Sequence, residues 1–131
     1  MLTLYAGFPA AIESLHALAE RWPASTTAIP EVPAGSRSRA GLATLLGVYG
    51  PVRASLLREL RRLHPALAAW VVEHGYGRVL ARGGLDAATR ELITVALLAG
   101  GPWPRQLASH RIGARRLGAS ARDLAAAMRP R

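Results

Sequence analysis

Residues 84–99, Gly-Leu-Asp-Ala-Ala-Thr-Arg-Glu-Leu-Ile-Thr-Val-Ala-Leu-Leu-Ala, predict a helix at the centre of the molecule. Asp86 is a residue type that caps helix N-termini, so we expect the helix to span 87–99. Its later half is apolar on nearly every side, and a helix of that kind has to be buried among other helices. The rest of the chain is therefore expected to pack around this segment.

The flanking segments are also helical in pattern, because apolar residues recur three and four positions apart and no long period-two alternation is present. We expect an all-α fold of about six helices. The predicted helices are an N-terminal one that begins near Pro9 and stops before Pro23, a short one at 39–46, and others at 51–63, 65–81, 87–99, 103–117 and after Ser120. Ser120 and Asp123 have the spacing of a capping box at the start of the last helix. Gly75 and Gly77 weaken the helix at 65–81 and can permit a close approach of another helix.

The chain is expected to form one compact domain, because it has 131 residues of which 50% are hydrophobic. Within it we distinguish an N-terminal helix (1–22), a proline-rich linker with a short helix (23–50) and a core (51–131). There is no cysteine, which excludes disulfides, thiolate zinc sites and CxxC redox chemistry. No group of His, Asp and Glu has metal-ligand spacing, so no metal and no cofactor are expected.

The net charge of +9, from 17 basic and 8 acidic residues, raises the question of nucleic-acid binding. All the basic residues are arginines and they are spread along the chain, whereas phosphate binding requires a patch. We therefore do not expect nucleic acid as a partner. The apolar runs are too short to span a membrane and no signal peptide is recognisable, so we expect a cytoplasmic protein without a membrane partner.

Glu91 and His110 are the candidate acid–base residues. Glu91 shares a helix side with Val95 and Leu98, and His110 lies on the apolar stripe of the helix at 103–117. A buried carboxylate needs a partner. Two interpretations stay open: the two residues pair as a general acid–base couple, or Glu91 pairs with an arginine and His110 is a satisfied core residue.

The segment 84–99, followed by Gln-Leu-Ala-Ser-His-Arg-Ile-Gly-Ala at 106–114 and Leu-Gly-Ala-Ser at 117–120, resembles the carboxymuconolactone decarboxylase family, which shares its fold with AhpD-like alkylhydroperoxidases. The resemblance extends upstream through 70–85, which is similar to the γ-carboxymuconolactone decarboxylase branch. It implies an AhpD-like helical fold and a homo-oligomer.

The N-terminal residues 2–15 resemble the segment that normally ends this family's domain. The chain therefore looks like a circular permutation, with 23–37 as the joining linker. This interpretation requires that Met1 and Met128 lie close together, or that the N-terminal helix is exchanged between protomers.

When the motif of the peroxidase branch is matched to this sequence, its relay glutamate and histidine correspond to Glu91 and His110. Its two cysteines correspond to Trp103 and Gln106. Indole and amide side chains cannot perform thiol chemistry, so the resemblance does not carry peroxidase activity to this chain. The cysteine-free branch implies loss of CO₂ from a small anionic organic acid or lactone, with Glu91 and His110 as catalytic residues and Trp103 and Gln106 beside the substrate.

Such a substrate requires cations, and Arg78, Arg82 or Arg90 can hold a carboxylate unless they are solvated surface charges. His74 and Tyr76 are expected either to line the same pocket or to fill space beside the core. The alternative function is a non-catalytic oligomeric binding or scaffold protein of the same fold. An open pocket lined by arginine at His110 favours the enzyme, and a closed core favours the scaffold.

Overall fold

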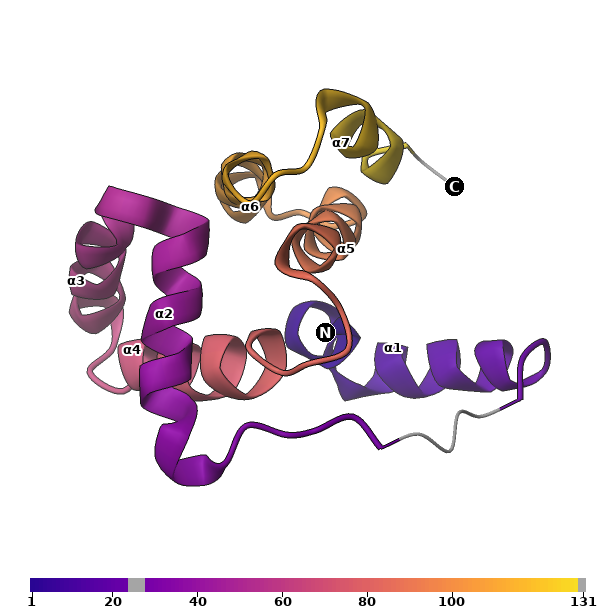
Figure 1. Ribbon diagram of the computed structural model, residues 1–131, viewed down its shortest axis with the longest axis horizontal. Coiled ribbons are helices and arrows are strands. Elements are labelled where there is room, and N and C mark those ends of the chain that lie inside the picture. Colours follow the sequence, from indigo (N-terminus) through magenta and orange to yellow (C-terminus); the bar gives the residue numbers. More distant parts are fainter. Residues whose placement is uncertain (24–27, 130–131) are drawn as a thin grey trace.

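The computed structural model describes residues 1–23 and 28–129, and in these ranges all regular structure is helical, which confirms the all-α prediction. Figure 1 shows two groups of helices. The first group consists of α2 (Arg37–Tyr49), α3 (Arg53–Leu63), α4 (Leu67–Trp70) and η3 (Val71–Leu80); the second consists of α5 (Ala87–Ala99), α6 (Pro104–Arg116) and α7 (Ala121–Ala127). The helix α1 (Leu2–Ala19) begins beside α5 and then extends away from both groups (Figure 1), and the short turns η1 (Ala34–Ser36) and η2 (Gly50–Val52) precede α2 and α3.

The helix starts predicted from capping residues are confirmed. The Asp86 side chain accepts a hydrogen bond from the backbone N–H of Thr89, and α5 spans Ala87–Ala99 as expected. Ser120 and Asp123 form a reciprocal capping box at the start of α7. Gly118, with φ 104°, ends α6 in the left-handed conformation that glycine adopts without strain.

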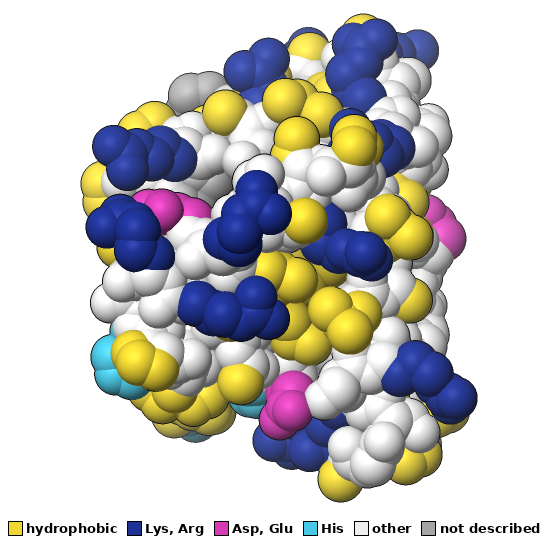
Figure 2. All heavy atoms as spheres, turned by 90° about the vertical axis from the view of Figure 1, so that its left-hand side faces the viewer, with side chains coloured by type: hydrophobic (Ala, Val, Ile, Leu, Met, Phe, Trp, Pro, Cys, Tyr) yellow, Lys and Arg dark blue, Asp and Glu magenta, His cyan; other side chains and the backbone are white. Residues whose placement is uncertain are grey.

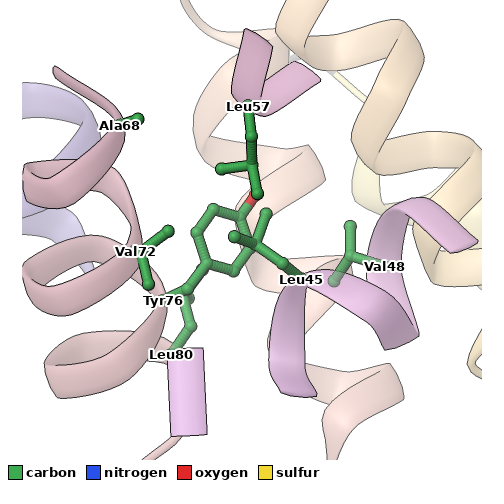
Figure 3. Close-up of a cluster of buried hydrophobic side chains, with 7 residues drawn as sticks. All are labelled: Leu45, Val48, Leu57, Ala68, Val72, Tyr76 and Leu80. Carbon is green, nitrogen blue, oxygen red and sulfur yellow. The ribbon is translucent and has the colours of Figure 1, made fainter. Parts of the chain in front are cut away.

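The first helical group is built on a close crossing of α2 and η3. A Cβ atom added at Gly41 would lie 2.1 Å from the Val72 carbonyl oxygen, and one added at Gly77 would lie 2.2 Å from the Arg37 carbonyl oxygen. Only glycine allows backbones to approach this closely, so the expectation for Gly77 is confirmed. Figure 3 shows the core cluster that this crossing holds together, with Tyr76 at its centre; its buried members are Leu45, Val48, Leu57, Ala68, Val72, Tyr76 and Leu80.

Two elements differ from the sequence prediction. The helix expected over 65–81 begins as α4 and continues over Val71–Leu80 as a π-helix, in which the turns are wider than in an α-helix. The short helix expected at 39–46 is longer and extends to Tyr49, where Gly50 with φ 56° ends it. The π-helix has only 10 residues, about two turns, which is too short a stretch for the apolar pattern to distinguish its wider turns from those of an α-helix.

The N-terminal helix also differs from its prediction: the sequence predicts a start near Pro9, whereas α1 begins at Leu2 and is bent at Gly7, whose φ of 80° and ψ of 174° are not helical. Residues before the bend enter the protein, where Met1 and Leu4 contact the first core cluster. Met128 packs instead against the second cluster, formed by Val95, Ala114 and Leu124. Met1 and Met128 thus pack against different clusters, and the circular permutation, with the N-terminal helix in cis or exchanged between protomers, stays a prediction.

The helical run 34–63 is long and apolar enough, by composition, to cross a membrane. It is two helices, because the chain bends at Gly50 and Pro51 between α2 and α3 (Figure 1). The 13 residues of α2 measure about 20 Å at 1.5 Å per residue, which is shorter than the roughly 30 Å of a bilayer core.

Candidate active site

Glu91 and His110 form a buried hydrogen-bonding contact between α5 and α6. Nδ1 of His110 lies 2.7 Å from Oε2 of Glu91, and the two side chains are 4% and 3% exposed. A carboxylate accepts, so Nδ1 carries the proton and Nε2 is the nitrogen that can accept or release one. Of the two interpretations left open by the sequence, the structure shows the pairing of Glu91 with His110.

The close approach of α6 makes this contact possible. Gly113, one turn after His110, faces both Val48 on α2 and Glu91 on α5, and an added Cβ would lie 2.6 Å from Val48 Cγ1 and 3.1 Å from Glu91 Oε2. The same face of α6 continues with Ala114, which is completely buried. Small residues at these positions therefore bring the imidazole within hydrogen-bonding distance of the carboxylate.

Three tyrosines surround the imidazole of His110. The Tyr76 ring is stacked on it with an interplanar angle of 6°, while the rings of Tyr5 and Tyr49 meet it edge-on at centroid distances of 6.0 Å. The Tyr76 hydroxyl lies 3.4 Å from His110 Nε2 and 3.4 Å from the Tyr49 hydroxyl. These contacts extend the line of polar atoms from Glu91 through His110 to two phenol groups.

The tyrosines are held in their neutral form by their surroundings. Burial is the main cause that raises the pKa of Tyr5, Tyr49 and Tyr76. The nearby Glu91 carboxylate also raises the pKa of each of them. All three hydroxyl groups consequently keep their protons at neutral pH and act as hydrogen-bond donors.

A cavity of about 350 Å³ opens beside His110. Its wall is mostly apolar, and its polar atoms come from the tyrosines, His74, Gln106 and His110. A site of this size and character accommodates a small organic molecule. The lining residues are Leu4, Tyr5, Tyr49, Leu56, Leu60, Trp70, Val71, His74, Gly75, Tyr76, Gln106 and His110.

The structure brings some of the expected substrate-binding residues to this cavity and places others elsewhere. His74, Tyr76 and Gln106 line it. Trp103 precedes α6 and its ring lies over Gly101, where an added Cβ would be 2.2 Å from Trp103 Cζ3. Arg78 forms a salt bridge of 3.7 Å with Glu31 of the linker.

Arg82 and Arg90 lie at a second cavity, of about 360 Å³, on the other side of Glu91. The Arg90 side chain is buried, and its Nη2 donates to the carbonyl oxygens of Arg82, Gly83 and Leu85. Burial and the neighbouring Arg82 lower the pKa of Arg90. Arg90 thus fastens the turn before α5, and within the described residues no arginine lines the cavity at His110.

The open cavity at His110 is the feature expected of the enzyme, but its wall carries tyrosines where arginines were expected. Tyr5 and Tyr49 were missed as site residues because they lie far from His110 in sequence. The predicted end of α2 at Leu46 also left Tyr49 outside any helix. Their aromatic side chains among apolar residues were the only available signal.

The arginines of this basic chain are spread over the surface. On the face shown in Figure 2, they are distributed from top to bottom with hydrophobic and uncharged side chains between them. In residues 1–23 and 28–129, no group of three or more His, Asp or Glu side chains is arranged to hold a metal ion.

Comparison with protein families gives one finding. The model of the carboxymuconolactone decarboxylase family matches residues 65–131, which is half of the chain and includes both Glu91 and His110. Neither a search of curated proteins nor a search of solved structures finds a match.

Proposed function

The chain belongs to the carboxymuconolactone decarboxylase family, and we propose that it catalyses acid–base chemistry, without a cofactor, on a small anionic organic acid or lactone. The observation that carries this proposal is the buried contact of 2.7 Å between Glu91 and Nδ1 of His110, in the wall of the cavity, which leaves Nε2 as the nitrogen not engaged by Glu91. A carboxylate behind an imidazole fixes its tautomer and stabilises its protonated form, as in other acid–base pairs.

In the proposed decarboxylation, the bond between the substrate carbon and its carboxylate breaks, CO₂ leaves, and the electron pair stays on the substrate. The step starts from the imidazolium form of His110, which carries a proton on each nitrogen. His110 gives the Nε2 proton to that carbon and becomes neutral, and a water molecule then returns a proton to Nε2 and leaves as hydroxide. Glu91 holds the imidazole ring in place through its contact with Nδ1.

The proposal is tested by measuring proton transfer and CO₂ release when the protein is mixed with a panel of small molecules. The panel contains five-membered unsaturated lactones, their carboxylated forms, and 2- and 3-oxo acids. NMR in D₂O follows deuterium entering the carbon next to the carbonyl, and a coupled assay follows CO₂. His110→Ala and Glu91→Gln are expected to lower the rate by at least about a hundredfold. His16→Ala, at an exposed position of α1, is the matched control and keeps the wild-type rate.

The proposal is wrong if the wild-type protein turns over no member of the panel, or if both dyad variants retain its rate. In either case the non-catalytic binding or scaffold function of the same fold becomes the better explanation.

We also propose that the protein is a homo-oligomer in which α1 contacts a second copy. The part of α1 after Gly7 carries large apolar side chains that are between 48% and 71% exposed at helical spacing: Phe8, Ile12, Leu15, Leu18 and, just beyond it, Trp22. Light scattering of the wild type and of Ile12→Glu with Leu15→Glu tests this assembly, and a monomeric wild type refutes it.

A further inference from the structure

The second cavity, beside Arg82 and Arg90, is a space of its own. Its volume is about 360 Å³, and it has no lining residue in common with the cavity at His110. It lies between α2 and the turn that joins η3 to α5, because its wall combines Ala43 and Gly47 of α2 with Arg82 of that turn. His110 does not line it, so a molecule bound here does not reach Nε2 and is not the reacting molecule of the proposed chemistry.

The two guanidinium groups at this cavity have hydrogen-bonding capacity to spare. Arg90 is 5% exposed, and its Nη2 donates to the carbonyl oxygens of the turn before α5. Its Nε and Nη1 donate to no acceptor in the described part of the chain. Arg82 is half-buried, and among the same residues it contributes to these side-chain hydrogen bonds only through its carbonyl oxygen. Donors of both arginines are therefore available to a ligand.

The positive charge of the two arginines is not balanced by a contacting acid. Among the residues that the structure describes, neither Arg82 nor Arg90 takes part in an ion pair. Burial lowers the pKa of Arg90, the Arg82 charge lowers it further, and Asp86 raises it. The Asp86 carboxylate is itself already bound by the backbone N–H and the hydroxyl of Thr89. An anion at the cavity would therefore relieve the repulsion between two neighbouring cations.

The rest of the wall determines what kind of anion fits. Its large apolar members are Val48, Leu80, Leu85 and Leu117. Glu91 also lines the cavity, but its Oε2 contacts His110 and it forms no ion pair with either arginine in the described residues. A second negative group on the ligand would be repelled by Glu91, and a bare inorganic ion would leave the apolar wall uncovered. A ligand with one carboxylate and an apolar body matches both features.

We propose that this cavity binds a small monocarboxylate, whose carboxylate accepts hydrogen bonds from Arg82 and Arg90 and whose apolar body lies against the wall. Arginine suits this role because its planar guanidinium presents paired donors to the two oxygens of a carboxylate. The inference goes beyond the proposed function and does not depend on it, since the two cavities are lined by different residues.

The test is isothermal titration calorimetry with benzoate, with benzamide as its neutral counterpart and acetate as the carboxylate without an apolar body. We expect benzoate to bind at least about tenfold more tightly than benzamide, because of its charge, and than acetate, because its ring is buried. Arg82→Gln is expected to weaken benzoate binding by at least about tenfold. Arg78→Gln is the matched control, because it removes the same charge from an arginine that pairs with Glu31 and lines neither cavity. We expect it to change benzoate binding by less than about twofold.

Two further variants show which cavity holds benzoate. Ala43→Leu, at an exposed position of α2, narrows the cavity at the arginines, and His74→Trp, at an exposed position of η3, narrows the cavity at His110. We expect Ala43→Leu to weaken benzoate binding by at least about tenfold and His74→Trp to change it by less than about twofold.

Three results would each overturn the inference. In the first, benzamide binds as tightly as benzoate. In the second, Arg82→Gln and Arg78→Gln weaken benzoate binding equally, which shows a general effect of net charge. In the third, Ala43→Leu binds benzoate as tightly as the wild type, and a loss confined to His74→Trp then assigns benzoate to the cavity at His110.

Discussion

Replacing Gly113 with alanine tests whether the close approach of α6 builds the Glu91–His110 pair. The added Cβ would lie 2.6 Å from Val48 Cγ1, which is 0.8 Å short of the 3.4 Å at which ordinary contact begins, and 3.1 Å from the Glu91 oxygen that His110 contacts. To relieve both contacts, α6 has to move away from α2 and α5. This movement lengthens the hydrogen bond on which the proposed acid–base chemistry depends.

The expected magnitude follows from two opposing effects. Overpacking a buried contact of this kind costs about 1–3 kcal/mol, and replacing a helical glycine with alanine returns up to about 1 kcal/mol. We expect a net loss of about 1–2 kcal/mol in the free energy of unfolding. Gly47→Ala in α2 is the matched control, because its Cβ would meet only the end of the Leu117 side chain at 3.4 Å.

Urea unfolding followed by circular dichroism gives both free energies, and comparing the two alanine variants removes the common helix-propensity effect. We expect Gly47→Ala to be the more stable variant by about 2 kcal/mol and to keep wild-type turnover, while Gly113→Ala loses turnover. If Gly113→Ala is as stable as Gly47→Ala and equally active, the close packing of α6 does not position the pair.

Three further predictions concern stability. Burial raises the pKa of Tyr5, Tyr49 and Tyr76 above the ordinary 10.0. As the pH rises through 10, the unfolded chain therefore loses these phenol protons before the folded protein does. The free energy of unfolding then falls by up to about 1.4 kcal/mol per pH unit for each tyrosine. Urea titrations between pH 8 and 11 check this, and a stability that is constant or rises contradicts it. Gly7→Ala forces alanine into φ 80° and is expected to cost about 1–2 kcal/mol, measurable by thermal unfolding, whereas an unchanged stability shows that the bend is not required. Arg90→Met removes the charged donor that the carbonyl oxygens of Arg82, Gly83 and Leu85 share and is expected to cost about 2 kcal/mol; urea unfolding with wild-type values would show that the turn does not depend on Arg90.

Local signals in the sequence were sufficient for much of the fold. Asp86 and Ser120 carry the start signals of α5 and α7 in their own side chains, and both caps form as expected. Glu91 and His110 could be chosen as candidates because each interrupts an apolar helix face. A polar residue on such a face needs a partner, and that requirement is visible without a structure.

The remaining features depend on contacts between distant segments. Nothing near Arg78 in the sequence indicates that Glu31 of the linker will be its partner. The position of Tyr49 at the cavity depends on the crossing of α2 with η3, which in turn depends on Gly41 and Gly77. Such pairings are set by tertiary packing, so side-chain periodicity could not reveal them.

The wall of the cavity at His110 combines residues from two parts of the chain, the part that matches the family and the part that precedes it. Glu91 and His110 lie within the family-matched residues 65–131, whereas part of the wall comes from before residue 65. Recognition of a new molecule can therefore diverge, in evolution or in the laboratory, while the pair that handles protons stays unchanged. The smallest library for redirecting the protein to another ligand would vary Leu4, Tyr5, Tyr49, Leu56 and Leu60.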